Sequence, residues 1–393
     1  GYPARIRDMF CRIRGGMEIH SGDTPSLIRP HMPELDSVRG IAILMVLFYH
    51  GMAPPLSPAL NGWARTLFLA TRVGWTGVNL FFVLSGFLIT GILLDTRTRA
   101  DYYPRFYLRR ALRILPALYV TLGALWLLGE VSLRFIAVGA FFLANSVNLF
   151  GLPLQYGPLW SLAVEEHFYL LWPSLVRKFS TSMLVLVLTV ICLGTPALRV
   201  VCWTMGRFPK DSAIFNTWFN LDGLALGSLL AVWIRHPSFS RRRLRQLAPA
   251  GLILGLISFA LFSRTAFTTL TLLPLSVNLA SAGLLTSMLL AGTSGWSFLV
   301  DRPILKFFGF ISYGLYLVHV LAFRGAERLL APVWAPLLST AGPGVAMVLR
   351  FMAGAGLGIG IAYLSRRSLE EKFLRMRFRA RPPLPAVEGA VAR

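Results

Sequence analysis

Acidic residues and cysteines are scarce in this chain, and charged residues of either sign make up little of it. Asp and Glu number 17 against 39 Lys and Arg, and only 14% of the 393 residues are charged. Cys11, Cys192 and Cys202 are too few and too scattered for a metal site or a disulfide framework, so we assign them no role and predict no metal. With 55% hydrophobic residues, the chain is too apolar for a water-soluble fold of this size.

The formal charge of +22 would suit nucleic acid, but the positions of the basic residues argue against such a partner. They lie in the breaks between apolar runs, and the sequence contains no aromatic-interleaved basic module or zinc-finger spacing. We therefore expect no nucleic-acid partner. Residues 1–35 contain no apolar run that could form a signal-peptide core, so the first apolar run is predicted to be a retained span.

Apolar runs recur from Gly40 to Ser365, and many are long enough to cross about 30 Å of hydrocarbon, which takes about 20 helical residues. They predict an all-α, polytopic membrane helix bundle with about ten transmembrane helices. The predicted spans lie near residues 41–59, 74–94, 112–129, 159–176, 181–198, 216–234, 248–263, 269–291, 306–323 and 346–365. Membrane lipid is then the main solvent of the protein.

The distribution of basic residues predicts the orientation of the bundle. A shorter apolar run at 135–150 contains Asn145 and Asn148, and we predict that it is re-entrant or interfacial. This assignment places 29 of the 39 Lys and Arg on the cytoplasmic side, as the positive-inside rule expects, with both termini cytoplasmic. The predicted parts are a cytoplasmic tail at 1–34, a membrane domain at 35–365 and a basic cytoplasmic tail at 366–393.

Polar residues inside apolar runs are costly in lipid and are therefore functional candidates. Arg39 and His50 lie eleven residues apart in the first span, which corresponds to about three helical turns and about 16 Å along one helix face. Arg39 is predicted at the cytoplasmic mouth and His50 near mid-membrane. In the second span, Asn79 and Ser85 are polar candidates, and Ser85 with Gly86 also suits plain close packing of helices.

Two arginines precede the third span. Arg110 and Arg113 are three residues apart, so they are neighbours on a helix surface and suit a phosphate-rich ligand. A purely topogenic role for these arginines is an equally good interpretation.

Two further stretches, in later spans, contain the most polar residues. The run from Trp160 to Pro173 contains two adjacent glutamates and a histidine within apolar sequence, a combination that favours function over structure. Ser161 and Glu165 follow one stripe of the predicted helix, together with Phe168 or Tyr169. A further stripe comprises three residues, Ser312, Tyr316 and His319, for which a helix-to-helix hydrogen-bond network is as good an explanation as a ligand site.

These groups predict a chemistry. An imidazole with a carboxylate within reach is a competent general base for an alcohol, because the carboxylate fixes the tautomer and stabilises the imidazolium. His50 and Glu165 would form such a pair if their helices are neighbours. A basic cytoplasmic mouth would hold an anionic donor, so we predict group transfer from a phosphate-bearing cytosolic donor to a hydroxyl that arrives from the other side.

Taken together, five stretches resemble the acyltransferase-3 family of membrane acyltransferases, which includes O-antigen and other polysaccharide O-acetyltransferases. They are the Arg39 and His50 pair, Phe81-Phe-Val-Leu-Ser-Gly-Phe87, Arg110-x-x-Arg113, Trp160-Ser-Leu-x-Val-Glu165-Glu-x-Phe-Tyr169 and Ser312-Tyr-x-Leu-Tyr-Leu-x-His319. They occur in the family's order over almost the whole membrane region. The sequence departs from the pattern at Asn79, where an acidic residue is frequent, and at His167, where an amide is frequent.

The resemblance implies an O-acyltransferase of the plasma membrane, in particular a bacterial inner membrane. It implies no bound cofactor, an acyl-CoA donor such as acetyl-CoA, and a carbohydrate or glycolipid acceptor. His50 would be the base or a transient acyl carrier, Glu165 the acidic group, and Arg39, Arg110 and Arg113 would bind the donor or support the site. The expected substrate-lining residues are Asn79, Ser85, Trp160, Ser161, Tyr169, Ser312, Tyr316 and His319. The alternative is a transporter or exporter without acyl transfer, for which matching halves with broken helices would be typical.

Overall fold

The computed structural model describes residues 29, 32–52, 60, 62–208, 214–290, 300 and 302–376. Residues 1–32 and Pro33–Arg393 form two separate units. All the described helices belong to the second unit, and no strand occurs among the described residues. The predicted tail at 1–34 and the part of the basic tail beyond 376 lie almost wholly outside the described residues.

The chain runs through a succession of helices with short connections. The first half comprises α2 (Pro33–Gly51), α3 (Gly62–Thr71), the 3₁₀ turn η2 (Arg72–Thr76), α4 (Gly77–Asp95), α5 (Tyr102–Leu127), α6 (Leu133–Ala140), η3 (Ala144–Phe150) and α7 (Leu159–Lys178). The second half comprises α8 (Thr181–Thr204), η5 (Thr217–Phe219), α9 (Asp222–Ile234), α10 (Arg241–Phe262), α11 (Ala266–Thr271), α12 (Leu273–Leu289), α14 (Pro303–Leu329), α15 (Ala331–Ser365), the π-helical turn η7 (Arg366–Glu370) and α16 (Glu371–Met376).

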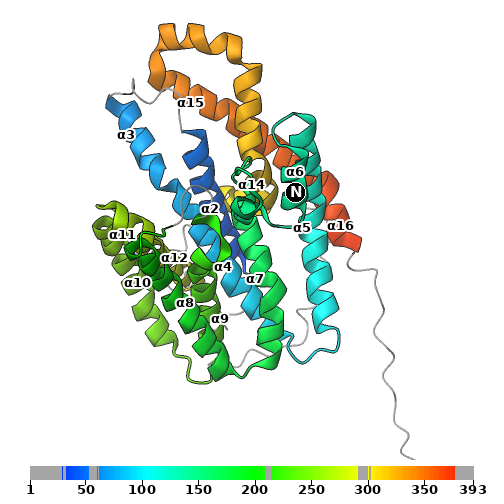
Figure 1. The fold of residues 1–393 in the computed structure, drawn as a ribbon, viewed down its shortest axis with the longest axis vertical. Coiled ribbons are helices and arrows are strands. Elements are labelled where there is room, and N and C mark those ends of the chain that lie inside the picture. The colour runs from blue at the N-terminus through cyan, green and yellow to red at the C-terminus, as the bar shows by residue number, and fades with distance from the viewer. Residues whose placement is uncertain are drawn as a thin grey trace, which may run out of the picture. The chain divides into compact units, whose positions relative to one another are not determined.

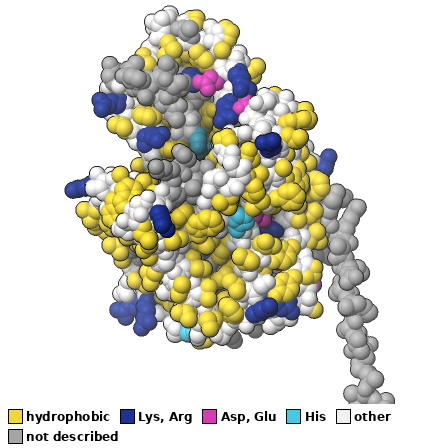
Figure 2. Space-filling model, in the orientation of Figure 1, with side chains coloured by type: hydrophobic (Ala, Val, Ile, Leu, Met, Phe, Trp, Pro, Cys, Tyr) yellow, Lys and Arg dark blue, Asp and Glu magenta, His cyan; other side chains and the backbone are white. Residues whose placement is uncertain are grey.

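Within the described part of the chain, six helical segments are long and apolar enough to cross a membrane. They are Gly62–Asp95, Tyr102–Leu127, Thr181–Thr204, Arg241–Phe262, Pro303–Leu329 and Pro336–Leu374, and α9 and α12 are shorter apolar helices. Large aliphatic side chains of α8 and α10, including Leu186, Leu193, Leu254 and Ile257, are more than half exposed. Figure 2 shows hydrophobic side chains over most of one face of the molecule. Such a surface suits lipid, since a soluble monomer rarely exposes so large an apolar area.

Several helices begin before the apolar runs that predicted them. Helix α5 begins at Tyr102 rather than near 112, α10 at Arg241 rather than near 248, and α2 covers Pro33–Gly51 rather than 41–59. The reason is that hydropathy marks the lipid-embedded part of a helix, whereas arginine, a good helix former, continues the helix beyond it. His50 consequently lies in the last turn of α2.

The run at 135–150 forms two short pieces, α6 and η3, instead of a transmembrane helix. Helix α6 has 8 residues and is about 12 Å long, far less than the hydrocarbon thickness. The side chain of Ser132 caps its start by accepting a hydrogen bond from the backbone N–H of Phe135. The prediction that this run does not cross the bilayer as a helix agrees with these elements.

The central helices pack closely. Helix α2 packs against α14 and α4, α4 also packs against α9 and α7, and α14 also packs against α15. In Figure 1, α2, α4, α7 and α14 lie in the middle of this unit, with α5 on one side and α8 to α12 on the other. Gly86 of α4 and Gly227 of α9 lie against the partner backbone, because a Cβ on either would overlap the carbonyl oxygen of Leu224 or Val83. Gly86 therefore serves close helix packing, as one interpretation of the sequence predicted.

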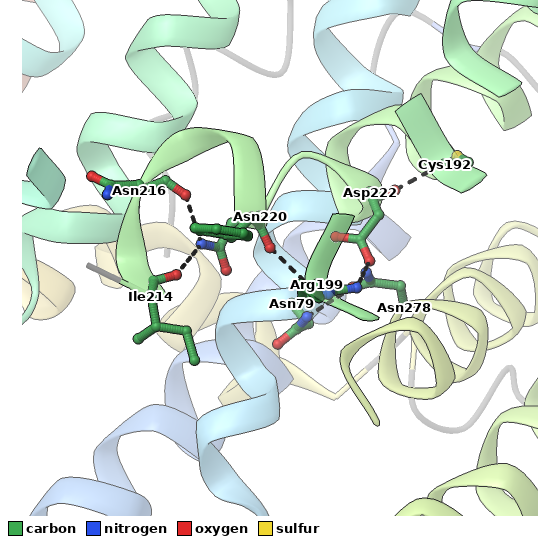
Figure 3. Close-up of polar contacts among 9 residues, drawn as sticks. Asn79, Cys192, Arg199, Ile214, Asn216, Asn220, Asp222 and Asn278 are labelled. Carbon is green, nitrogen blue, oxygen red and sulfur yellow. Dashed lines mark hydrogen bonds and ion pairs between the residues drawn. The ribbon is translucent and has the colours of Figure 1, made fainter. Parts of the chain in front are cut away.

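A buried ion pair joins α8 to α9 (Figure 3). The Arg199 guanidinium donates to the Asp222 carboxylate at 2.6 Å and to the carbonyl oxygen of Phe219 at 3.1 Å. Only 2% of the Arg199 side chain and 3% of the Asp222 side chain are exposed. A separate hydrogen bond, from the Asn79 amide to the Asn278 side chain at 2.8 Å, links α4 to α12. These polar contacts hold α8 against α9 and α4 against α12.

Candidate functional site

Helices α2, α4, α5, α7 and α14 enclose a cavity of about 120 Å³, which we call the central cavity. Its apolar lining is supplied mainly by α4, including Phe81 and Phe82. Its polar lining comprises Arg39, Ser85, Arg110, Arg113, Ser161, Glu165, Tyr169, Ser312, Tyr313 and Tyr316. Most of the residues that the sequence predicted for the site are thus brought together by five helices that are distant in sequence.

Glu165 is the acidic group of the central cavity. One carboxylate oxygen accepts a hydrogen bond from the Ser85 hydroxyl at 2.9 Å, and the other accepts one from the Tyr169 hydroxyl at 2.9 Å. The Arg110 guanidinium lies 4.7 Å from the centre of the Tyr169 ring, a distance typical of a cation–π contact. The carboxylate is therefore held by α4 and α7, and a cation of α5 lies behind its tyrosine partner.

Three arginines give the cavity an excess of positive charge. Arg39 pairs with Asp36 at 2.6 Å, so its charge is partly balanced. Arg110 lies over aromatic rings, and Arg113 has no hydrogen bond or ion pair to any residue in the described part of the chain. A guanidinium with five N–H donors and no protein acceptor is suited to an anionic ligand.

A second basic cavity, of about 130 Å³, lies beside the central one and shares Arg110 and Arg113 with it. Its other basic residues are Arg105 and Arg109, on the first turns of α5. In the loop before α5, hydrogen bonds from Arg99 and, to a smaller extent, Arg105 hold the pKa of Asp101 at about 2. Asp101 therefore stays ionised at physiological pH and keeps pairing with both arginines at this mouth.

The predicted contact between His50 and Glu165 is wrong. Both oxygens of Glu165 accept from Ser85 and Tyr169, whereas the ring of His50 contacts His319, whose Nε2 lies 3.2 Å from His50 Nδ1. The reason is that α2 packs along α14, which carries His319. The spacing of residues along one helix predicts which of them share a face of that helix. It carries no information about which helices are neighbours.

The hydrogen bonds of the two histidines fix their tautomers. His319 Nδ1 lies 2.8 Å from the carbonyl oxygen of Tyr316, and because a carbonyl only accepts, this nitrogen carries the proton. In the neutral ring Nε2 is then an acceptor for the N–H of His50 Nδ1, which is shared between this nitrogen at 3.2 Å and the carbonyl oxygen of Val46 at 3.1 Å. The remaining nitrogen of His50, Nε2, keeps its lone pair for chemistry. His319 thus holds the orienting position that the sequence assigned to Glu165.

Three predicted lining residues lie elsewhere. The side chain of Asn79 is bonded to Asn278, Trp160 stacks on Phe215 with ring centres 4.7 Å apart, and His319 contacts His50. None of these residues lines the central cavity. Asn79 and Trp160 belong to contacts between helices, and His319 belongs to the histidine pair.

Several residues that line the two cavities were not predicted from the sequence. Tyr313 lines the central cavity and donates to the carbonyl oxygen of Ile114 at 2.8 Å. Its position next to Ser312, within a run of aromatic and apolar residues, was the only signal. A smaller cavity beside His50 includes Glu327, Trp334 and Arg350. The signal there was an arginine within an otherwise apolar run, and the two other residues lie where hydropathy had placed a loop.

Comparison with known families assigns this helical bundle to a class. A family model described as an acyltransferase domain matches residues 32–367. The chain therefore belongs to the acyltransferase-3 family, as the five motifs indicated.

Named relatives are similar over part of their length. The peptidoglycan O-acetyltransferase OatA of Listeria monocytogenes is 34% identical over 171 residues, which is 38% of this chain and 25% of that protein. The putative peptidoglycan O-acetyltransferase YrhL of Bacillus subtilis is 28% identical over 323 residues, 74% of this chain and 48% of that protein. A putative O-acetyltransferase of Staphylococcus aureus is 29% identical over 332 residues, 74% of this chain and 50% of that protein. The chain spans half or less of the length of these relatives. No solved structure matches the chain.

Proposed function

We propose that this protein is a multi-pass O-acyltransferase of the plasma membrane, in particular a bacterial inner membrane. It moves an acyl group, in particular acetyl, from cytoplasmic acyl-CoA to a hydroxyl of an extracytoplasmic or lipid-linked carbohydrate. The observation that carries the proposal is the sharing of Arg110 and Arg113 between the basic cavity and the central cavity that contains Glu165. Family membership and the names of the relatives support acyl transfer over a transporter.

The two cavities match the two halves of a CoA thioester. Four arginines at the start of α5 line the basic cavity and suit the phosphates of the nucleotide half, since guanidinium groups bind phosphate with paired, charge-assisted hydrogen bonds. The lining of the central cavity from Val78 to Leu88 is largely apolar and suits the pantetheine arm. The thioester would then lie beside Glu165, Ser161 and Tyr316. In this arrangement Glu165 contacts the donor and does not contact His50.

His50 supplies the base or the acyl carrier. As a base, Nε2 takes the proton of the acceptor hydroxyl while the oxygen attacks the thioester carbon, and the thiolate leaves with that proton. As a carrier, Nε2 itself attacks and CoA leaves as the thiolate. The acceptor oxygen then displaces the imidazole, and the hydroxyl proton passes to the thiolate. In both routes a C–S bond is exchanged for a C–O bond. His319 accepts the N–H of His50 and stabilises the positive charge that develops on the imidazole.

Release of CoA thiol from acetyl-CoA by the purified protein, with and without a crude glycan-lipid extract, tests the proposal. We expect the extract to stimulate release, and His50→Ala to abolish the stimulated release. His236→Ala serves as the matched control, because this histidine lies in the loop after α9 and bonds to Ser238. Absence of release from several acyl-CoAs by folded wild-type protein would reject acyl transfer and favour the transporter.

A second measurement tests the donor site. Arg113→Gln should raise KM for acetyl-CoA by about tenfold, the usual effect of losing a hydrogen bond to a charged group. KM for acetyl-pantetheine, which lacks the nucleotide phosphates, should hardly change. Arg242→Gln, an exposed arginine at the start of α10, is the control. Equal effects on both donors would show that Arg113 does not bind the nucleotide half.

A further inference from the structure

His50 lines a second, smaller cavity that the donor site does not include. This cavity, of about 60 Å³, is formed by His50, Gly51, Phe323, Glu327, Trp334 and Arg350. It lies at the last turn of α2, whereas Arg39 of the central cavity lies near the first turn. The two cavities share no lining residue. Because one water needs about 10–15 Å³ of cavity volume, the smaller cavity has room for several waters or for one polar edge of a ligand.

The polar groups of this cavity form a neutral, hydrogen-bonding set. Arg350 of α15 forms an ion pair with Glu327 of α14, and the pair stays accessible, since 44% of the Glu327 side chain and 16% of the Arg350 side chain are exposed. The indole N–H of Trp334 donates to the carbonyl oxygen of Glu327 at 3.2 Å. The orientation of the indole is therefore fixed, and its N–H is already bonded.

We propose that this cavity binds the hydroxyl-bearing edge of the acceptor, and that the acceptor is an uncharged sugar ring. This inference rests on the proposed acyl transfer. A carboxylate next to a guanidinium supplies acceptors and donors for neighbouring hydroxyl groups. An indole supplies a flat apolar surface for the C–H face of a pyranose. The pair carries no net charge, so the set favours a neutral glycoside over an anion or a cation.

The position of His50 gives the cavity its role. A sugar hydroxyl that enters the cavity meets the imidazole directly, because His50 is one of the six lining residues. Its oxygen forms the new bond to the acyl carbon, its proton passes to Nε2 of His50, and the C–S bond of the donor breaks. The proton then passes from Nε2 to the sulfur, which gives the CoA thiol. Glu327 and Arg350 position the ring and take no part in the proton transfer.

Steady-state kinetics separate this site from the donor site. With acetyl-CoA and methyl N-acetyl-β-glucosaminide as substrates, Glu327→Gln, Arg350→Gln and Trp334→Phe should each raise KM for the glycoside about tenfold or more. KM for acetyl-CoA should not change. Arg328→Gln is the matched control, because Arg328 lies on the same turn of α14 but pairs with Glu130. An unchanged KM for the glycoside in all three variants would overturn the inference.

A binding measurement keeps the inference distinct from the proposed function. Saturation-transfer NMR of wild-type protein in nanodiscs, with the methyl glycosides of glucose, galactose and N-acetylglucosamine and no acyl-CoA, should show binding of at least one. Arg350→Gln should lose that signal while its thermal unfolding stays cooperative. Sugar binding without any thiol release would reject the acyl transfer and keep the sugar site. Binding of none of the three, or equal binding by the variant, would overturn the sugar site itself.

Discussion

His319 illustrates how much a single residue's role depends on its neighbour. From sequence it was one polar residue of a helical stripe, and in the structure its Nε2 faces His50 while its Nδ1 is bonded to backbone carbonyls. This arrangement leaves one nitrogen of His50 available. His319 is therefore a positioning residue for the proposed base.

Replacement of His319 should separate orientation from binding. His319→Ala should lower kcat about tenfold, because the N–H of His50 then keeps the carbonyl oxygen of Val46 as its single acceptor and one hydrogen bond that orients the ring is lost. KM for acetyl-CoA should stay the same. His319→Gln, whose side-chain oxygen also accepts, should recover part of kcat. An alanine variant as active as wild type in the thiol-release assay would contradict the role.

Asp222 contributes to stability rather than to the site. Its partner Arg199 is almost fully buried, so Asp222→Asn leaves a positive charge without a counter-ion. We expect a loss of about 3–5 kcal/mol of stability, the usual cost of breaking a buried pair, and a clear fall of Tm in detergent. Asp95→Asn is the control, because Asp95 pairs with Arg235 but is 52% exposed. Equal Tm values for the two variants would contradict this prediction.

The sequence predicted which residues line the site better than it predicted which of them contact one another. Arg39, Ser85, Arg110, Arg113 and Glu165 were recognisable because each is polar within or beside an apolar run, and all line one cavity. The partners of His50 and Asn79 were not predictable, because spacing along one helix carries no information about which helix lies next to it. Glu327 and Trp334 were missed because hydropathy treated residues 324–345 as a loop, whereas α14 and α15 extend through them. Arg350 lies within the predicted span 346–365, but its partner Glu327 lies in that predicted loop, so nothing marked the arginine as part of a site.

At the scale of elements, the crossing of α4 and α9 sets the position of Ser85. Gly86 follows Ser85 directly, and a side chain at Gly86 would overlap the backbone of α9. The Ser85 hydroxyl then reaches Glu165 on α7. In the pair Ser85-Gly86, a residue that lines the site is thus followed directly by a residue required for helix packing.

Gly86→Ala should separate α4 from α9 and reduce both stability and activity. Because the clash is with backbone and cannot be relieved by a rotamer change, we expect a loss of several kcal/mol, above the 1–3 kcal/mol typical of overpacking. Gly123→Ala serves as the control, since nothing lies within 4 Å of a Cβ at that position. Thermal unfolding and thiol release measure the two effects. An unchanged Tm for Gly86→Ala would show that the helices separate at little cost.

At the scale of the whole molecule, the proposal depends on which side each cavity faces. The positive-inside rule predicts that the loop between α9 and α10 is cytoplasmic and that the loop between α10 and α11 is outside. In a background with the native cysteines replaced by serine, Ser263→Cys should react with an impermeant maleimide in intact cells. Ser238→Cys should react only after permeabilisation. The reverse pattern would invert the proposed direction of transfer.

The separation of the arginine-lined cavities from the cavity beside His50 has an electrical consequence. The phosphates of CoA would stay on the side of the arginines, and only a neutral acyl group would pass the histidine pair. Moving one charge through 100 mV changes the free energy by about 2.3 kcal/mol, so passage of the whole polyanionic donor would be tied to the membrane voltage. Transfer of the acyl group alone is electrically silent, and its rate should therefore not vary when the voltage across a reconstituted membrane is set to different values.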